Sequence, residues 1–405
     1  MTPPLSEQPA ARDAAPRLLF ITNDFPPRVG GFQSYYWGLV RTLRPEDVVI
    51  MAPAHPRAAA FDATHPYRVV RTRESVVWPT PRNLRVAEDL AAEHDAELVQ
   101  LGHPLPAGLL GPALARRRGL PYVVMLGGAE LTLPATWPVG GQLLRYVLGN
   151  ARLLITVSDY TTAAAQRLLG ARVPAHTVRP AMDVDRFPLT SGAARAQARR
   201  RLGVTGTLVL CVGRLVPRKG QDHLVEAVGR LATKWPDLEV ALVGGGRLSY
   251  HLQKRAGELG IGERVRLLGS LSAPEMAQWL EAADIFASPC RSRWGGLEVE
   301  GFGIVFVEAA LCGLPVLAGR SGGSVEAAKT GDTGIVVDGA SVDEVTAGLE
   351  RLLRAGEARR AELGLAGRRL GLERHDPEAV GRRYRLLLAE AAARPAAPVG
   401  TGREA

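Results

Sequence analysis

The sequence has few features of a membrane-spanning, exported or disulfide-bonded protein. No stretch approaches the ~18 consecutive apolar residues that a helix needs to cross a bilayer, and the opening MTPPLSEQPAARDAAPR lacks the basic-then-apolar order of a signal peptide. The three cysteines, Cys211, Cys290 and Cys312, are odd in number and far apart, which favours neither a disulfide framework nor a metal site. These absences predict a protein of the reducing cytoplasm.

Lysine is also scarce. The chain has four lysines among 50 basic residues, and arginine supplies most of a net charge of +9 with a pI of about 9.9. This balance fits an anionic partner such as phosphate ligands, acidic lipid headgroups or nucleic acid. An arginine bias of codon usage on a solvated surface would give the same balance. No run interleaves aromatic with basic residues, so we do not expect nucleic acid as a partner.

The 405 residues fit two or three domains. Short apolar runs alternate with helical patterns, which indicates parallel sheets covered by helices on both faces. A first series of strands is expected at 17–22, 48–52, 97–102, 121–126 and 152–158. After a break at 180–206, a second series is expected at 208–213, 239–246, 264–269, 284–289, 315–319 and 334–338. The fold class is therefore α/β, with two doubly wound, Rossmann-like domains that face one another across a cleft.

The same pattern predicts the domain boundaries. We expect a disordered tail at 1–16, an N-terminal domain at 17–184, a C-terminal domain at 185–376, a helix at 377–393 that could pack back on the first domain, and a second disordered tail at 394–405. In open α/β sheets ligands bind beyond the carboxyl ends of the strands. Site residues are therefore expected on loops that directly follow strands.

Two cations stand on such a loop in LVLCVGRLVPRKGQDHLVEAV. Arg214 directly follows an apolar strand, and Lys219 lies just before a helix. A helix N-terminus already favours anions, so two cations there suit a diphosphate. The alternative is that these are solvated loop cations, an interpretation that fits Arg218 better than Arg214.

Carboxylates are the notable feature of GGLEVEGFGIVFVEA, which contains Glu298, Glu300 and Glu308. Glu300 and Glu308 form an E-x7-E pattern around the start of a predicted helix, and Gly301 and Gly303 leave the first amides of that helix open. Amides can bind phosphate, and carboxylates can accept hydrogen bonds from the vicinal hydroxyls of a sugar or ribose. Alternatively, Glu300 stabilises the helix N-terminus and Glu308 pairs with a core arginine.

A glycine pair, Gly30 and Gly31, lies between a strand and a helix in NDFPPRVGGFQSYY, where the backbone can approach a ligand closely. The spacing is not GxGxxG, and the acidic residue expected about twenty positions later in a dinucleotide site is missing. A dinucleotide-dependent dehydrogenase is therefore disfavoured.

Taken together, GRLVPRKGQD, EGFGIVFVEA, LCGLPVLAGRSGG and TNDFPPRVGGFQSYY resemble the retaining family 4 glycosyltransferases of the GT-B architecture. Within that family the sequence is most similar to the bacterial GDP-mannose-dependent phosphatidylinositol monomannoside mannosyltransferases, over roughly residues 17–390. The resemblance implies a hexosyltransferase, specifically an α-mannosyltransferase of glycolipid biosynthesis. It assigns the acceptor to the N-terminal domain and the nucleotide sugar to the C-terminal domain.

The resemblance also implies roles for individual residues. Arg214 and Lys219 would bind the donor diphosphate and, with Glu300 on the donor sugar, would carry catalysis. Glu308 would hold the nucleotide ribose. The remaining donor-binding positions that it implies are Gly30 and Gly31, the amides near Gly303 and Ile304, and the backbone near Leu271. It implies no metal and no cofactor besides the donor, GDP-mannose, because cations and amides replace a metal.

One position departs from the family, which often carries a His-Gly pair whose histidine contacts the donor sugar. Here that place reads VVMLGGAELTLP, with Gly127 where the histidine would stand, followed by Gly128 and Glu130. His103 is nearby in sequence but not aligned. Either another group supplies the contact, or the sugar or acceptor differs.

Three functions therefore remain open. The first is mannosyl transfer to a lipid or glycan acceptor by a cytoplasmic protein, peripheral on the inner face of the cell membrane, where the basic balance fits acidic lipid. The second is a glucosyltransferase that uses another nucleotide sugar and a soluble acceptor. The third is a non-catalytic nucleotide-sugar-binding protein, which the missing histidine motivates.

Overall fold

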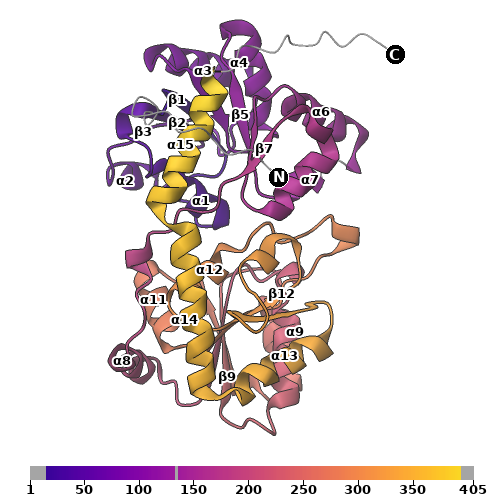
Figure 1. Cartoon of the computed structure of the whole chain (residues 1–405). Helices are drawn as coiled ribbons and strands as arrows, with labels where there is room; N and C mark the ends of the chain where they lie inside the picture. Colours follow the sequence, from indigo (N-terminus) through magenta and orange to yellow (C-terminus); the bar gives the residue numbers. More distant parts are fainter. Residues whose placement is uncertain (1–14, 133–135, 394–405) are drawn as a thin grey trace. The chain divides into compact units, whose positions relative to one another are not determined.

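The computed structural model describes residues 15–132 and 136–393. The chain divides into two compact units: unit 1 comprises Met1–Met182 and Pro377–Ala405, and unit 2 comprises Asp183–Asp376. Each unit is built on one parallel sheet with helices around it (Figure 1), which confirms the predicted fold class of two Rossmann-like domains.

The predicted tails lie largely outside the described residues, which exclude 1–14 and 394–405. Ala15 and Pro16, which the sequence placed in the first tail, are buried and belong to the folded part of unit 1. No helix in the described part of the chain combines the length and the apolar character that crossing a bilayer requires.

The sheet of unit 1 has seven strands in the order β3-β2-β1-β4-β5-β6-β7. The strands are β1 (Leu18–Ile21), β2 (Val48–Ala52), β3 (Arg68–Arg71), β4 (Leu98–Leu101), β5 (Tyr122–Leu126), β6 (Leu154–Thr156) and β7 (Ala175–Thr177). Every residue of the five inner strands is buried, since helices cover both faces of the sheet. The two strands that the sequence analysis missed, β3 and β7, are the edges. Edge strands are less buried and need no continuous apolar run, so RVVR and AHT gave no signal.

The helices of unit 1 follow the strands along the chain. They are α1 (Gly31–Val40), α2 (Ala58–Asp62), α3 (Pro81–Glu93), α4 (Leu110–Arg118), α5 (Ala129–Thr132), α6 (Pro138–Gly149), α7 (Asp159–Leu169) and α15 (Pro377–Ala393). Local sequence fixes several of their starts: Thr80 caps α3 by accepting a hydrogen bond from the Asn83 amide, and Ser158 caps α7 by accepting one from Thr161.

Helix α15 belongs to unit 1 although it follows unit 2 in the chain. The hydroxyl of its buried Tyr384 donates a hydrogen bond of 2.6 Å to Oε1 of Gln100 in the central strand β4. Arg385 donates to the carbonyl oxygen of Thr42 at 2.9 Å. The buried glutamine amide in the sheet is thus satisfied by a side chain 284 residues away.

The sheet of unit 2 has six strands in the order β10-β9-β8-β11-β12-β13. The strands are β8 (Thr207–Val212), β9 (Leu238–Val243), β10 (Val265–Gly269), β11 (Ile285–Ser288), β12 (Val316–Gly319) and β13 (Gly334–Val337), and each matches a predicted apolar run. The helices are α8 (Gly192–Leu202), α9 (Gln221–Leu231), α10 (Ser249–Glu258), α11 (Ala273–Ala282), α12 (Ile304–Leu311), α13 (Val342–Arg354) and α14 (Gly356–His375).

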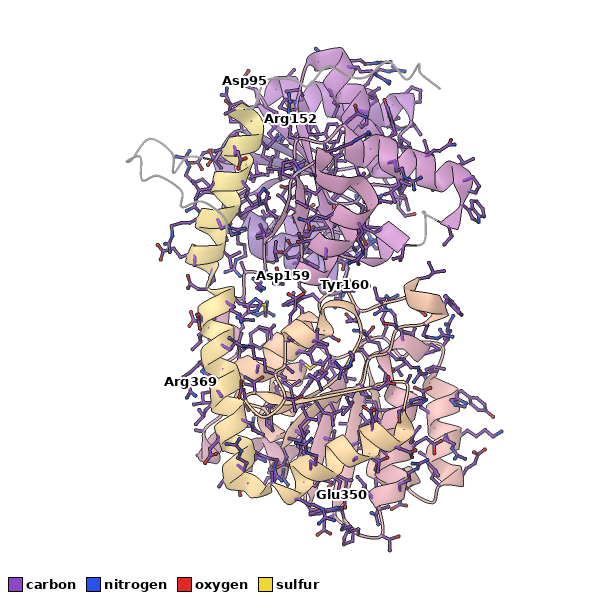
Figure 2. All side chains as sticks on the ribbon, turned by 45° about the vertical axis from the view of Figure 1, so that its right-hand side comes forward. Asp95, Arg152, Asp159, Tyr160, Glu350 and Arg369 are labelled. Carbon is purple, nitrogen blue, oxygen red and sulfur yellow. The ribbon has the colours of Figure 1, made fainter. Side chains whose placement is uncertain are left out.

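Strand order reverses once in each sheet, between β1 and β4 in unit 1 and between β8 and β11 in unit 2. Ligands of such sheets bind where the carboxyl ends of these strands diverge. Figure 2 shows the two ends of unit 1: Asp95 and Arg152, which precede strands, lie at one end, whereas Asp159 and Tyr160, which follow β6, lie at the other.

Candidate active site

The two residues of unit 2 that are predicted to bind the donor diphosphate, Arg214 and Lys219, lie at the carboxyl end of the central strand β8. The loop after β8 leads into a short 3-10 helix, η6 (Pro217–Lys219), which ends immediately before α9. The side chain of Lys219 is buried there, whereas Arg214 is exposed and no described residue pairs with its guanidinium. One cation is therefore fixed inside the protein and the other is free to meet a ligand.

Lys219 forms a buried ion cluster with Glu300. Its Nζ lies 2.8 Å from Oε2 of Glu300, and Nη1 of Arg218 donates to the same oxygen at 2.5 Å. Burial by itself lowers the pKa of Lys219, but Glu300 outweighs this effect and the pKa is raised. Burial by itself raises the pKa of Glu300, but the charges of Lys219 and Arg218 hold that pKa below its ordinary value. All three groups are thus charged at neutral pH, and two cations with one carboxylate leave one net positive charge.

The expectation that Arg218 is a solvated loop cation is wrong. Its side chain is 15% exposed, and besides Glu300 it lies 3.8 Å from Oε1 of Glu298. Glu298 is held in turn by Arg293, whose Nη1 lies 2.9 Å from Oε2. Arg218 and Glu300 are 82 residues apart in sequence, so no local pattern could reveal this contact.

The backbone of Glu300 is fixed as firmly as its side chain. Its amide donates to Oγ of Ser321 at 3.1 Å, and its carbonyl oxygen accepts from the Gly323 amide at 2.9 Å. Ser321 and Gly323 belong to the turn after β12, at the carboxyl end of that strand. The carboxylate therefore has a fixed position before any ligand arrives. Sequence reasoning did not identify Ser321.

Glu308 presents the opposite case. It lies half-buried on α12, and no described residue makes an ion pair or hydrogen bond with its carboxyl group. Burial raises its pKa to about 7, and the distant charge of Arg186 offsets only part of this effect. The alternative that Glu308 pairs with a core arginine is therefore not supported. An unpaired carboxyl group with a raised pKa is a candidate for ligand binding.

The start of α12 also lacks internal partners. Gly303 occupies the N-cap position with a φ of 84°, and a Cβ atom there would lie 2.5 Å from Cδ2 of Phe306. Only glycine fits this conformation without strain. No described residue accepts a hydrogen bond from the Gly303 or Ile304 amides, and no side chain caps the helix. These N–H groups at a helix N-terminus can bind a phosphate oxygen.

Leu271 follows β10 and precedes the capping serine of α11. Its side chain packs against the apolar core of unit 2. The contact of its backbone with the base of the donor stays a prediction.

Gly30 and Gly31 belong to unit 1, whereas the other predicted site residues belong to unit 2. Gly30 is the N-cap of α1, after the carboxyl end of β1. A Cβ atom at Gly31 would meet nothing within 4 Å. Gly31 is thus exposed, whereas a Cβ atom at Gly30 would lie 2.4 Å from Oε1 of Gln33, and the role of the pair in donor binding stays a prediction.

The structure explains why no side chain stands at Gly127, where the family has histidine. A Cβ atom there would lie 2.0 Å from Cζ of Phe32, whose ring occupies the space. That ring lies edge-on to His103, with 4.8 Å between the ring centroids, and Nε2 of His103 lies 2.5 Å from Oδ2 of Asp24. The amides of Gly127 and Gly128 instead donate to Glu130. An imidazole is therefore present in this neighbourhood, but it comes from the loop after β4 rather than the loop after β5.

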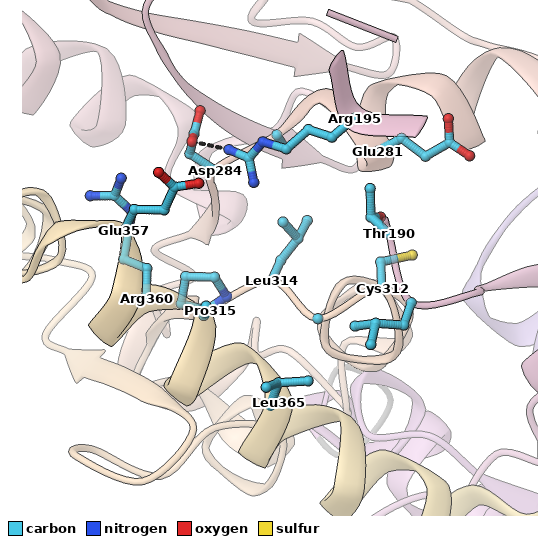
Figure 3. A pocket seen from close by; sticks show the side chains of 14 residues that line it. Thr190, Arg195, Glu281, Asp284, Cys312, Leu314, Pro315, Glu357, Arg360 and Leu365 are labelled. Carbon is cyan, nitrogen blue, oxygen red and sulfur yellow. Dashed lines mark hydrogen bonds and ion pairs between the residues drawn. The ribbon is translucent and has the colours of Figure 1, made fainter. Parts of the chain in front are cut away.

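A separate hollow of about 250 Å³ lies elsewhere in unit 2 (Figure 3). Asp284 and Pro315, which line it, immediately precede β11 and β12, so the hollow lies at the amino ends of the strands. Arg195, one of the two arginines that line it, pairs with Asp284. This hollow is therefore not part of the candidate site at the carboxyl ends.

Comparison with known proteins bears directly on this geometry. The family model "Glycosyl transferases group 1" matches residues 195–369, and "Glycosyltransferase Family 4" matches residues 29–186. Among solved structures, Anabaena Alr3699/HepE in complex with UDP aligns with a TM-score of 0.79 at 20% identity, covering 92% of this chain and 99% of the other. Sucrose-phosphate synthase from Thermosynechococcus elongatus aligns with a TM-score of 0.75 at 21% identity, covering 92% and 99%. At such identities the likeness concerns the fold alone.

Several relatives match in sequence over most of the chain, among them the following two. The GDP-mannose-dependent alpha-(1-6)-phosphatidylinositol monomannoside mannosyltransferase of Mycolicibacterium smegmatis is 40% identical over 92% of this chain and 98% of its own length. The GDP-mannose-dependent monoacylated alpha-(1-6)-phosphatidylinositol monomannoside mannosyltransferase of Corynebacterium glutamicum is 36% identical over 88% of this chain and 93% of its own length. Two Rossmann-like domains, each matched by one of these family models, define a glycosyltransferase of the GT-B architecture. More narrowly, the chain belongs to glycosyltransferase family 4.

Proposed function

We propose that this hexosyltransferase transfers mannose from GDP-mannose, with retention, to a phosphatidylinositol mannoside or a closely related lipid. The relatives of that name support the donor and the acceptor class. The observation that carries the proposal is the combination in unit 2 of the Lys219–Glu300 cluster, the exposed Arg214 and the open amides of α12. A diphosphate needs such positive charge, and a sugar at each end needs hydrogen-bonding carboxylates.

The donor diphosphate would be held by charge that is fixed before binding. Arg214 would contact it from the exposed side, Lys219 from the buried side, and the amides of Gly303 and Ile304 would donate to phosphate oxygens. The cluster of Lys219, Arg218 and Glu300 carries one positive charge, and Arg214 adds a second. Two positive charges match a diphosphate diester, and their charge would stabilise the diphosphate as it leaves.

The sugar ends of the donor would meet the two glutamates. Glu308, which is bonded to none of the described side chains, would accept hydrogen bonds from the ribose hydroxyls. The second oxygen of Glu300, Oε1, is bonded to no described residue, and this atom would contact the mannose. Since both cations hold Oε2, the position of Oε1 is set in advance, and catalysis would come from positioning the sugar.

The acceptor hydroxyl would attack the anomeric carbon from the face that the diphosphate leaves. The bond to the diphosphate breaks as the bond to the acceptor oxygen forms, and the departing phosphate oxygen takes the acceptor proton. No protein nucleophile takes part. The proposal includes no metal and no cofactor, so turnover should survive a metal chelator.

The acceptor class also implies a location. A lipid acceptor requires contact with a membrane, and the net charge of +9 fits a surface of acidic headgroups. We therefore place the protein peripherally on the inner face of the membrane.

A donor-by-acceptor matrix with purified protein tests the proposal. GDP-mannose with a phosphatidylinositol mannoside should give product, and UDP-glucose with soluble acceptors should not. Transfer of glucose to a soluble acceptor would contradict the proposal and identify a glucosyltransferase instead. Stabilisation by GDP without release of GDP from GDP-mannose, with or without acceptor, would identify a binding protein instead.

A further inference from the structure

The connection from β11 to α12 in unit 2 carries an exposed tryptophan beside the candidate site. Trp294 is 61% exposed and begins a short 3-10 turn. Arg293 and Glu298, on either side of this turn, form an antiparallel β-bridge, in which the Arg293 amide donates to the Glu298 carbonyl oxygen at 2.9 Å and the Glu298 amide donates back at 3.2 Å. Residues 293–298 thus form a small hairpin, the Trp294 hairpin, and Glu300 follows two residues later.

The backbone of Trp294 adopts a conformation that a bulky side chain disfavours. Its φ is 51°, in the left-handed region, and the next two residues, Gly295 and Gly296, have φ angles of 63° and 92°. Among the described residues other than glycine, Asp95 is the second one with a positive φ, and aspartate tolerates that region far better than an aromatic residue does. Glycine would suit position 294 best, so tryptophan strains the backbone there. Strain of this kind is concentrated at ligand sites, which makes the indole a candidate for ligand binding.

A continuous series of contacts connects the indole to the buried ion cluster. The guanidinium of Arg293 lies over the indole ring of Trp294, 4.7 Å from its centroid. Nη1 of Arg293 lies 2.9 Å from Oε2 of Glu298, and Oε1 of Glu298 lies 3.8 Å from Nε of Arg218. Arg218 in turn binds Glu300. The ring is therefore held by side chains that also fix the proposed sugar-binding carboxylate.

The chemistry around the indole suits a saturated, polyhydroxylated ring. The Arg293 guanidinium covers part of the indole, and the exposure of 61% leaves most of the rest open to solvent. The C–H face of such a ring can pack on the aromatic surface, while its hydroxyls bond to the charged groups beside it. A protein partner fits less well, since one exposed aromatic side chain falls far short of the ~800 Å² per partner that a stable interface buries.

We propose that Trp294 is a stacking platform for a sugar or inositol ring of the acceptor, and that the Trp294 hairpin contributes to acceptor selection. This inference rests on the proposed function. The donor mannose has the same ring chemistry, but its proposed contact, Oε1 of Glu300, belongs to a buried side chain. The indole is exposed, and three side chains separate it from Glu300. The ring that receives the mannose arrives from solvent and lies next to the mannose on the open side, where the indole is.

Replacing Trp294 in the full-length protein tests the platform, with GDP-mannose and phosphatidylinositol monomannoside as substrates. Trp294→Gly should raise the KM for the acceptor about 10-fold with little change in kcat. It should not lower the melting temperature, because glycine suits this backbone conformation. The Kd values for GDP and GDP-mannose, measured by isothermal titration, should remain those of the wild type. Trp294→Tyr should restore most of the acceptor KM, and Tyr250→Ala, which removes another exposed aromatic side chain of unit 2, should leave it unchanged.

The outcomes separate this inference from the proposed function. An unchanged acceptor KM in Trp294→Gly would overturn the platform. Weaker binding of GDP-mannose with unchanged binding of GDP would assign the indole to the donor mannose and overturn the acceptor contact. A raised KM that Trp294→Tyr does not restore, with a lower melting temperature in both variants, would show a structural role only. Any of these results beside normal wild-type transfer rejects the inference alone, whereas a wild-type protein that makes no mannosylated product rejects the proposed function and this inference with it.

Discussion

The segment between Glu300 and Glu308 contains two carboxylates in opposite electrostatic settings. Glu300 is buried, bonded to two cations, and its pKa is lowered. Glu308 is half-buried, has no partner among the described residues, and its pKa is raised to about 7. Burial acts in the same direction on both, so the difference comes from pairing. A paired carboxylate has a fixed position and charge, whereas an unpaired one keeps its hydrogen-bonding capacity for a ligand.

The largest expected effect comes from removing the paired carboxylate. Glu300→Gln leaves the buried Lys219 without its counter-charge and leaves Arg218 with Glu298 at 3.8 Å, and should lower the free energy of unfolding by about 3–5 kcal/mol. The folded-state pKa of Glu300 is lowered, so the stabilisation is present above the ordinary glutamate pKa and is lost as the pH falls through the folded-state value. The difference between wild type and variant should therefore shrink in acid. Urea unfolding at several pH values measures it, and equal stability of the two proteins at neutral pH would contradict the buried cluster.

The second-largest expected effect is a lower catalytic rate. Lys219→Ala removes the buried cation that is proposed to contact the diphosphate, and kcat should fall by ~10²–10³, as with other preorganised donors. Lys254→Ala is the matched control, since that lysine is exposed and pairs only with Glu258 on the surface. Steady-state kinetics with GDP-mannose measures kcat for both variants. Similar kcat values for both variants would remove Lys219 from the catalytic site.

The unpaired carboxyl group of Glu308 should make stability depend on pH in the opposite direction. Wild-type stability should fall as the pH rises from the ordinary glutamate pKa to about 7, because the folded state releases the Glu308 proton later than the unfolded chain. Glu308→Gln removes this loss, so the variant should gain about 1–3 kcal/mol over the wild type above neutral pH and almost nothing in acid. Urea unfolding of both proteins at about pH 5 and about pH 8 measures the difference. A variant that is less stable than the wild type at the higher pH would mean that Glu308 has a partner.

The same variant should bind donor more weakly despite its greater stability. Loss of charge-assisted hydrogen bonds to the ribose should raise the Kd for GDP about 10–100-fold. Isothermal titration should also show wild-type affinity increasing as the pH rises through about 7, where Glu308 ionises, and a flat profile for the variant. If the Glu308→Gln variant binds GDP as tightly as the wild type, a residue other than Glu308 contacts the ribose.

The sequence revealed these regions to different degrees. Apolar runs identified every buried strand, because inner strands of parallel sheets are covered on both faces. They missed β3 and β7, whose edge positions demand no such run. Lys219, Glu300 and Glu308 could be proposed because loops at strand ends bind ligands, and two cations and two acids stood there. Two features could not be predicted: that Arg218 shares Glu300 with Lys219, and that Glu308 pairs with nothing in the described part of the chain. Contacts across 82 residues depend on how the strands are ordered in the sheet.

Glu298, just before this segment, should give the smallest effect of the three carboxylates. It tests whether pairing or burial determines how much a carboxylate stabilises the fold. Glu298 is paired with Arg293 at 2.9 Å, but its side chain is 21% exposed and that of Arg293 is 26% exposed. Water and salt screen such a pair, so Glu298→Gln should cost only ~0.5–1 kcal/mol, and the cost should decline in high salt. The Glu300→Gln cost should change little under the same conditions, because its ion pairs are shielded from solvent. If the two costs fall together as salt is added, solvent reaches Glu300 as readily as Glu298, and the contrast between a fixed and a free carboxylate would have to be explained without burial.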